Sequence, residues 1–399
     1  MTQWTRAARL AGGVGLAAVL LAGCASQPAA EPEPESASAS DETSAEETGT
    51  RVAVAYSGGV LVLDGETLEV IEDLPSEDFV RLNPAGDDRH AFVTTSEGFQ
   101  VLDMTTPELT DQVVAAATAG HVVRHAGHTV LYDDATSDTT IFETADLAAM
   151  DGEFPAAEVV EGVDAHHGVS VLLKDGTFLT TVGDESGRTG IRVLDDHGHE
   201  VASSDECPGV HGEGTAQNEA VVFGCENGAL LYADGEITKL TAPDEYGRSG
   251  NAYVSENSPL VIMDYKNDPD AEGSLLSNIA LVDTEAHTYE PVALPDGIQY
   301  TWRGVLRTDS GDVIMIGSDG QLHTIDPASG EITESFAAIE AWEGPAEWQE
   351  EHPAIGLAGD IAYVTDSANS RIVAIDITTG ETIATSDLPH APNELVVVG

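Results

Sequence analysis

The chain has 399 residues, of which 41% are hydrophobic, so it is long and apolar enough to bury a sizeable core. Only 5% of the residues are aromatic. Its 71 acidic and 15 basic side chains give a formal net charge of −56, which argues against nucleic acid and anionic membrane surfaces as partners because both would be repelled. So many carboxylates cannot all be ligands, and we interpret most of them as a solvated acidic surface. The chain is rich in Val, Thr, Gly and Asp, which favour short strands and tight turns.

The N-terminal residues predict an export signal. Arg6 and Arg9 precede a short apolar run over residues 10–22, which is too short for a comfortable transmembrane helix. The sequence Leu-Ala-Gly-Cys24 resembles a bacterial lipobox, which predicts cleavage of residues 1–23 as a signal peptide and lipidation of Cys24. The alternative is an ordinary cleaved secretion signal. We therefore expect the protein to be held by lipid on the extracytoplasmic side of the cell membrane.

A tether is expected between the lipid and the folded domain. Residues 24–50 are mostly Ser, Glu, Pro, Ala and Thr, show no apolar periodicity and contain no histidine. Such a composition predicts a disordered acidic segment. The folded domain is expected over residues 51–399.

The remaining cysteines, Cys207 and Cys225, form an even pair in an exported chain. A disulfide between them is the default expectation in an oxidising compartment. The alternative is a pair of thiolate ligands to zinc.

From Arg51 onward one unit recurs: a lead-in, a turn with Gly or Asp, a strand rich in Val and Ile, a strand ending near Asp, and a short polar strand. Recurrence at roughly 40–50 residues with about four strands per unit is typical of β-propeller blades. Clear copies lie at residues 82–103, 168–195, 308–326 and 356–376.

The number of blades follows from the lead-ins. Lead-ins are expected near Arg81, His121, His167, His211, Arg248, Trp302 and His352, with a last one at the C-terminus. There, a single strand beginning after Pro392 has no partner, and the N-terminal strands over residues 52–64 lack a lead-in. Pairing the two ends completes one blade and leaves no open sheet edge. The prediction is an all-β protein with a single propeller of eight blades; seven is the alternative, because the unit at 248–296 is irregular.

Three histidines recur at the blade period. His121, His166 and His211 fall about 45 residues apart, so neighbouring blades would present them side by side at one mouth of the central channel. Three imidazoles suit zinc, which takes three or four ligands at about 2.0–2.1 Å from histidine nitrogen. Either His166 or His167 could serve, and His167 is favoured because it comes directly before the strand, as His211 does.

Other side chains are further candidates for metal binding. Glu213 or Asp164 is expected either to complete the ligand shell or to orient an imidazole. His352 and His390 occupy lead-ins of the last two blades, and with His125 they are candidates for a second metal site. The remaining histidines are interpreted as surface or core residues.

Several motifs resemble the AztD family of periplasmic zinc metallochaperones. They are Ala119-Gly-His121-Val-Val-x-His125, His166-His167-Gly-Val, Cys207-Pro-Gly-x-His211-Gly-Glu213, Gly224-Cys225-x-x-Gly228 and Ala358-Gly-Asp-x-x-x-Val-Thr-Asp366. The resemblance extends over most of residues 51–399. It implies a propeller that binds zinc and delivers it to the solute-binding protein of a zinc ABC transporter, with Cys207 and Cys225 as a disulfide that braces the site.

One departure from the family concerns the tether. Family members carry a His- and Asp-rich N-terminal stretch, whereas residues 24–50 here contain Glu, Ser and Pro without histidine. Zinc capture is then expected to depend on the folded site. The expected protein is a monomer and not an enzyme, and its expected metal is zinc.

The sequence leaves two other functions open. A propeller that binds a protein or carbohydrate at the cell surface, using Trp302 and the tryptophans at 342 and 348, would make the histidines incidental. A metal-dependent hydrolase would need an open zinc position for water, but the sequence contains no Ser-His-Asp constellation and no Gly-x-Ser-x-Gly elbow.

Overall fold

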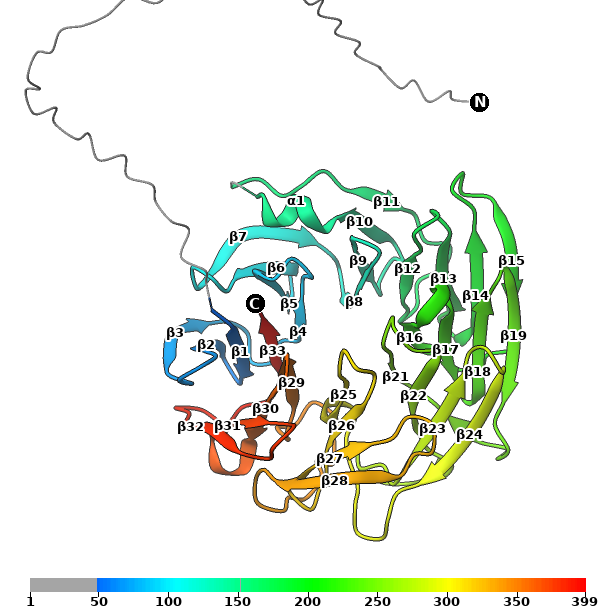
Figure 1. Ribbon diagram of the computed structural model, residues 1–399. Helices are drawn as coiled ribbons and strands as arrows, with labels where there is room; N and C mark the ends of the chain where they lie inside the picture. Colours follow the sequence, from blue (N-terminus) through cyan, green and yellow to red (C-terminus); the bar gives the residue numbers. More distant parts are fainter. Residues whose placement is uncertain (1–48, 151) are drawn as a thin grey trace, which may run out of the picture. The chain divides into compact units, whose positions relative to one another are not determined.

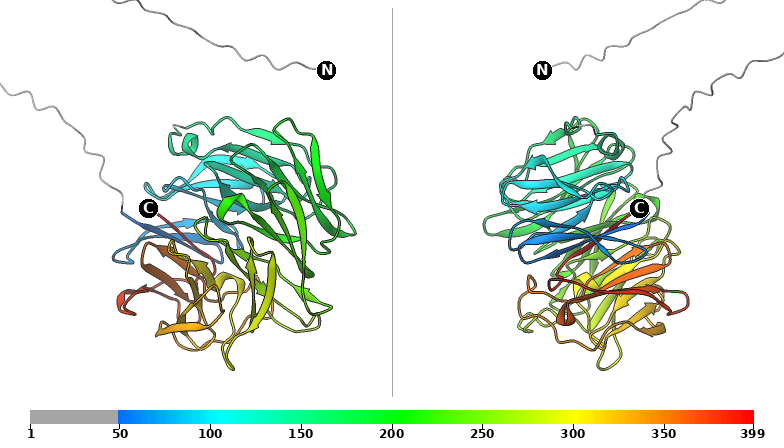
Figure 2. Two further views of the ribbon diagram at one scale, coloured as in Figure 1. Left: turned by 45° about the vertical axis from the view of Figure 1, so that its right-hand side comes forward. Right: turned by 90° about the vertical axis from the view of Figure 1, so that its left-hand side faces the viewer.

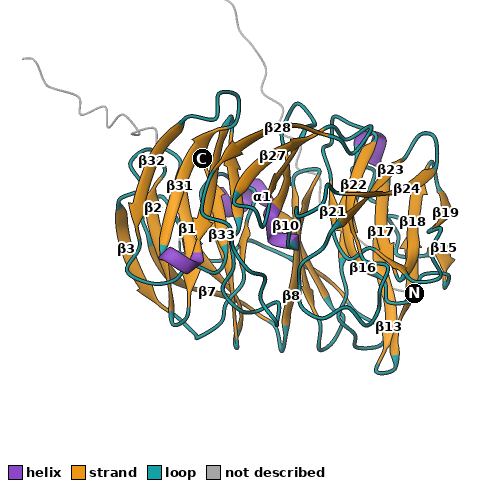
Figure 3. Ribbon diagram, turned by 90° about the horizontal axis from the view of Figure 1, so that it is seen from below, coloured by secondary structure: helices purple, strands orange, loops and turns teal. Residues whose placement is uncertain are grey.

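Eight antiparallel sheets stand around a common axis in this computed structural model, which describes residues 49–150 and 152–399 (Figure 1). Within each sheet the strand nearest the axis comes first in the chain and the outermost comes last, except in the sheet that joins the two ends (Figure 1). Seen from the side, the sheets stand next to one another around the ring (Figure 3). The predicted signal peptide, Cys24 and the tether up to residue 48 lie outside the described residues.

The blades are numbered here along the chain. Blade 1 contains β33 (Leu395–Val398), β1 (Arg51–Tyr56), β2 (Gly59–Asp64) and β3 (Val70–Pro75); blade 2 contains β4 (Leu82–Pro84), β5 (His90–Thr95), β6 (Gly98–Asp103) and β7 (Glu108–Ala115); blade 3 contains β8 (Ala119–His125), β9 (His128–Asp133), β10 (Thr139–Glu143) and β11 (Glu158–Val160); blade 4 contains β12 (Ser170–Leu172), β13 (Phe178–Asp184), β14 (Gly187–Leu194) and β15 (Glu200–Ser204).

The second half of the chain repeats this arrangement. Blade 5 contains β16 (His211–Thr215), β17 (Val221–Cys225), β18 (Asn227–Ala233) and β19 (Glu236–Thr241), with β20 (Gly247–Arg248) beside β18; blade 6 contains β21 (Ala252–Tyr253), β22 (Leu260–Tyr265), β23 (Asn278–Asp283) and β24 (Thr288–Ala293); blade 7 contains β25 (Val305–Arg307), β26 (Val313–Ile316), β27 (Gln321–Ile325) and β28 (Ile332–Ala337); blade 8 contains β29 (Ile355–Ala358), β30 (Ile361–Asp366), β31 (Arg371–Asp376) and β32 (Thr382–Asp387).

Helical turns are few and short. They are α1 (Thr144–Ala148), η1 (Gln217–Glu219), η2 (Trp302–Gly304) and η3 (Ser367–Asn369). In the part of the chain that the structure describes, no helix is long and apolar enough to cross a membrane.

The hydrophobic core is a ring of layers between blades. The two middle strands of a blade are buried on both faces, as the continuous apolar runs of β2 and β31 illustrate. Each of the eight junctions between neighbouring blades holds one apolar cluster; Ile191 of blade 4 and Phe223 of blade 5, for example, belong to the same cluster. The outer strands are mostly exposed, which explains their polar sequences.

The recurring Asp at the end of the third strand has a local cause. In blade 2, Oδ1 of Asp103 accepts hydrogen bonds from the backbone N–H groups of Thr105 and Thr106, at 2.9 and 3.0 Å. Asp376 of blade 8 does the same with Thr378 and Thr379. The side chain thus closes the turn into the outer strand, which is why this residue type recurs at the blade period.

The ring closes through the two ends of the chain. Strand β33 pairs antiparallel with β1, and Arg51 lies opposite Val398. Figure 2 shows this seam from two further sides. The predicted all-β propeller, its eight blades and its closure are confirmed. Blade 6 is the irregular one, because β21 has only two residues and a long connection separates β22 from β23.

Candidate metal centre

Three neighbouring blades bring three histidines together. His121 lies on β8 of blade 3, His167 precedes β12 of blade 4, and His211 begins β16 of blade 5. One nitrogen from each lies within 4.8 Å of the other two. The ring centroids are 5.0–5.2 Å apart. The three residues are called the histidine cluster below.

Local irregularities in the strands turn these side chains toward one another. The pairing of β8 with β9 shifts register between Ala119 and Val122, and the pairing of β16 with β17 shifts between His211 and Glu213. Such bulges re-aim a side chain. Gly212 has a φ of +64°, which favours glycine, and a Cβ there would lie 2.4 Å from the Gly250 carbonyl oxygen. The glycine after His211 therefore permits the bulge.

Each imidazole is oriented through its Nδ1 atom. Nδ1 of His121 lies 2.8 Å from the Gly168 carbonyl oxygen, and Nδ1 of His211 contacts the Gly250 carbonyl oxygen. Nδ1 of His167 lies 2.6 Å from Oδ2 of Asp134. These partners only accept hydrogen bonds, so each Nδ1 carries a proton, and a ring that is neutral presents the lone pair of its Nε2. This assignment of tautomers follows from the contacts.

The lone pairs meet at close range. The Nε2 atoms of His167 and His211 are 2.9 Å apart. Two lone pairs at this distance repel each other unless a proton or a metal ion lies between them. The cluster thus has the donor set of a metal site: imidazole nitrogens fixed from behind by a carboxylate and two carbonyls.

Burial favours the neutral form of His121 and His211. Desolvation is the main cause that lowers the pKa of His121 to about 4, and the neighbouring His167 contributes to the same direction. The pKa of His211 is also well below its usual value, mainly because of burial and secondarily because of His121. Neutral imidazoles are the form that binds metal ions. The side chain of His167 is 44% exposed, so the cluster remains open to solvent on that side.

Asp134 is the site residue that sequence reasoning missed. It follows β9, away from any lead-in, and its partner His167 belongs to the next blade. A signal was present in Gly120, where a Cβ would lie 2.4 Å from Oδ1 of Asp134. The glycine before His121 therefore makes room for this carboxylate.

The disulfide is confirmed. Cys207 and Cys225 are bonded, with their Cα atoms 4.9 Å apart, and both are fully buried. Cys225 ends β17, the strand paired with β16, and Cys207 lies in the connection that leads to His211. The bond therefore joins both ends of the segment that carries His211.

His166 is not part of the histidine cluster. It is buried, and its Nε2 contacts the hydroxyls of Tyr132 and Thr181 at 3.1 and 3.0 Å. Its Nδ1 lies 2.8 Å from the Asp164 carbonyl oxygen. Adjacent residues of an extended segment point to opposite sides, so only one of His166 and His167 can face the axis. His166 packs inward between blades.

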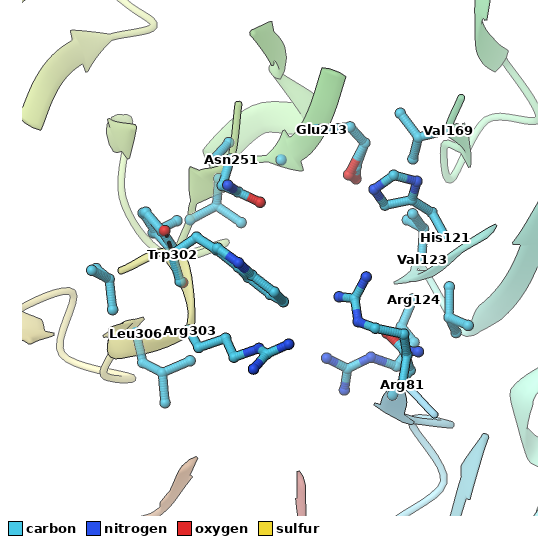
Figure 4. A pocket seen from close by; sticks show the side chains of 18 of the residues that line it. Arg81, His121, Val123, Arg124, Val169, Glu213, Asn251, Trp302, Arg303 and Leu306 are labelled. Atoms are coloured by element: carbon cyan, nitrogen blue, oxygen red, sulfur yellow. Dashed lines mark hydrogen bonds between the residues drawn. The ribbon is translucent and has the colours of Figure 1, made fainter. Parts of the chain in front are cut away.

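Glu213 also lies apart from the cluster. Its carboxylate is not among the grouped ligand atoms and points instead into the central channel, as Figure 4 shows. Burial raises the pKa of this carboxyl to about 7. The carboxylate that orients an imidazole is that of Asp134.

The histidines proposed for a second site do not meet. His125 lies between Glu219 and Glu256, His352 is buried beside Arg303, and His390 stacks on Tyr56 with ring centroids 4.0 Å apart. Within the described residues, the histidine cluster is the one group of three or more His, Cys, Asp or Glu side chains close enough to share an ion. The second site is therefore not assembled.

Comparison with known proteins supports the family resemblance. The zinc chaperone AztD of Citrobacter koseri is 25% identical to this chain over 303 residues, which is 75% of this chain and 70% of the relative. The resemblance to AztD is confirmed. No family model matches the chain.

Solved structures show the same fold. Apo AztD from Citrobacter koseri superimposes with a TM-score of 0.73 at 22% identity, covering 88% of this chain and 98% of AztD. A second crystal structure of AztD from that organism gives 0.72 at 21% identity over the same shares. The dihydro-heme d1 dehydrogenase NirN is more distant, with a TM-score of 0.56 at 13% identity over 86% of this chain and 74% of NirN.

Proposed function

We propose that this protein is a zinc metallochaperone, which captures zinc outside the cytoplasmic membrane and delivers it to the solute-binding protein of a zinc ABC transporter. The observation that carries the proposal is the convergence of the three imidazole rings of His121, His167 and His211, each held from behind through its Nδ1 atom. The similarity to the zinc chaperone AztD supports the choice of metal and of a non-enzymatic role.

Capture uses the neutral cluster. Three imidazole nitrogens provide three of the four ligands that zinc takes in proteins. Asp134 is engaged with His167 at 2.6 Å, so its role is to orient that ring rather than to bind the ion. The fourth position is left for water or for a side chain of the partner.

Transfer uses the exposed edge of the cluster. His121 and His211 are partly buried, whereas the His167 side chain is 44% exposed. A ligand from the solute-binding protein would approach on this side, bind the open position, and replace His167 first. Ligand exchange of this kind moves the ion without releasing it into solution. We propose further that the chain acts as a monomer held to the membrane by lipid on Cys24.

Zinc affinity tests the proposal. Competition with a chelator at buffered free zinc should give one tight site per chain. His121→Ala, His167→Ala and His211→Ala should each weaken it by about 100-fold or more, since losing even an orienting partner costs 10- to 100-fold. His199→Ala, an exposed histidine in a turn, is the matched control and should bind zinc like the unaltered protein.

Delivery is tested separately. Zinc-loaded protein is mixed with the metal-free solute-binding protein, and the metal content of each is measured after separation. Transfer faster than dissociation into an excess of chelator supports a chaperone. Equal rates would mean that the protein binds zinc but does not act as a chaperone. Unchanged affinity in the three alanine variants would mean that the histidine cluster is not the zinc site.

A further inference from the structure

The central channel contains a cavity of about 450 Å³, called the channel cavity below. Its lining includes His121, Arg81, Arg124 and Arg303. Figure 4 shows the three guanidinium groups pointing into the same space. They come from blade 2, blade 3 and the turn η2 before blade 7, so the fold gathers them from distant parts of the chain.

This gathering is unusual for the composition. The whole chain has 15 Lys and Arg residues against 71 Asp and Glu, and its surface therefore repels anions. Three of these few cations share one cavity. Three arginines gathered in one cavity of a strongly acidic protein indicate a local need for positive charge at that place.

Carboxylates in the cavity leave one arginine without an ion pair. Glu394 serves two of them, lying 2.6 Å from Nε of Arg81 and 3.1 Å from Nη2 of Arg303. Glu256 is paired with His125 at 2.9 Å. Arg124 forms no ion pair with any residue that the structure describes.

Three guanidinium groups and three carboxylates, those of Glu213, Glu256 and Glu394, line the cavity. Glu394 contacts two of the guanidinium groups and Glu256 contacts His125, so Arg124 is left without an ion pair among the described residues. The Arg124 side chain is exposed, so its guanidinium group is accessible to a ligand that enters the channel. A bound anion would supply the missing counter-charge.

The guanidinium groups are held in place before any ligand arrives. The ring of Trp302 lies beside two of them, with its centroid 4.8 Å from Cζ of Arg81 and 5.0 Å from Cζ of Arg303. Arg303 is 6% exposed and also donates to the side chain of Asn393. The stem of Arg124 packs over Gly86, where a Cβ would lie 3.0 Å from Cδ. Rigid, planar forks of this kind match the geometry of oxyanions.

We propose that the channel cavity binds a small oxyanion, of the phosphate or carboxylate class, with Arg124 as its main contact and Arg81 and Arg303 beside it. The volume suits a small molecule rather than a macromolecule. The inference concerns the metal-free protein and stands whether or not zinc binds. If zinc does occupy the histidine cluster, as proposed above, the anion would also offset its repulsion from the arginines.

Anion titration of the metal-free protein tests this site. Inorganic phosphate is added at constant ionic strength in chelator-treated buffer, and binding is followed by calorimetry and by the fluorescence of the tryptophans, one of which is Trp302. We expect saturable binding of one phosphate per chain. Acetate, titrated in the same way, distinguishes a phosphate from a carboxylate preference, and saturation by either supports the site.

Matched variants decide whether Arg124 is the contact. Arg124→Gln should weaken phosphate binding at least about tenfold, since a hydrogen bond to a charged group is worth roughly 1.5–3 kcal/mol. Arg192→Gln removes the same charge on β14, outside the channel cavity, and should leave affinity unchanged. Arg124→Lys keeps the charge but loses the fork, and its weakened binding tests the site if Arg124→Gln does not fold. No saturation by either anion, or equal affinities in the Arg124 and Arg192 variants, would overturn the proposal.

Discussion

The two halves of the channel mouth use the same repeat position for different purposes. At or just before the inner strand of each blade, one half carries histidines and the other carries an ion-paired network. The residues are His121, His167 and His211 on blades 3 to 5, and Arg303, His352, Glu394 and Arg81 on blades 7, 8, 1 and 2.

The difference between the halves lies in what each polar atom meets. In both, a backbone carbonyl holds an imidazole through Nδ1: Gly168 for His121, and Glu350, at 2.7 Å, for His352. The Nε2 of His121 faces two more imidazoles, whereas His352 is 1% exposed, beside Arg303, with no second imidazole. Three converging rings form a donor set, but a single buried ring only fills space. Convergence, rather than the presence of histidine, separates the candidate metal centre from the rest of the ring.

The largest effect is expected from breaking the ion-paired half. Glu394→Gln leaves Arg81 and Arg303 facing each other, and the Arg303 side chain is only 3% exposed. Removing one partner of a buried pair costs about 3–5 kcal/mol, so the free energy of unfolding in urea should fall by that amount. Zinc affinity should not change. Asp196→Asn, at an exposed carboxylate, is the control; a similar loss in both variants would contradict this account.

The pH dependence of stability tests the ion-paired half of the channel mouth through a smaller expected effect. Burial, and secondarily the charge of Arg303, lower the pKa of His352 to about 4. Between pH 6.5 and 4 the unfolded chain takes up a proton here while the folded chain does not, so stability is complete above pH 6.5 and falls as the pH drops. At 1.36 kcal/mol per pH unit the loss is about 2 kcal/mol from pH 6.5 to 5.

A variant isolates this contribution. His352→Gln cannot take up the proton, so metal-free His352→Gln should lose about 2 kcal/mol less than the unaltered protein between these two pH values. His199→Gln, at an exposed turn, should keep the original slope. Parallel stability curves for His352→Gln and the unaltered protein would show that His352 titrates normally.

The repeat made most of this architecture predictable from sequence. Strand-forming runs, a turn-closing Asp such as Asp103, and a lead-in every 40–50 residues or so define a blade wherever they recur. Register alone placed His121, His167 and His211 at one mouth. The register of the repeat could not predict the contacts between side chains of different blades. Asp134 orients His167 from the neighbouring blade, and the match between Glu394 and two arginines depends on the final closure of the ring.

The next largest effect is expected from substituting Asp134, in the histidine half of the channel mouth. Asp134→Asn keeps the shape of the side chain but replaces the carboxylate with an amide. The amide can present its N–H to Nδ1 of His167, so the tautomer of that ring is no longer fixed. Zinc affinity should fall about 10- to 100-fold, as is typical of an orienting partner, with little change in stability. Asp164→Asn, at an exposed carboxylate close to His167 in sequence, is the control. Equal zinc affinities in the two variants would mean that Asp134 plays no part in orienting the ring.

The smallest effect is expected at the opposite end of β8, where His125 lies. Both of its ring nitrogens face carboxylates, Glu256 at 2.9 Å and Glu219 at 3.0 Å, so both are already engaged by the protein. The Glu256 side chain is 64% exposed, and its ion pair is therefore screened by solvent. Glu256→Gln should change stability by less than about 1 kcal/mol and leave the zinc stoichiometry at one. A second zinc equivalent that disappears in Glu256→Gln would place a metal at both ends of the strand. An imidazole enclosed by carboxylates would then bind zinc as well, and convergence of imidazoles would not be what distinguishes the metal centre.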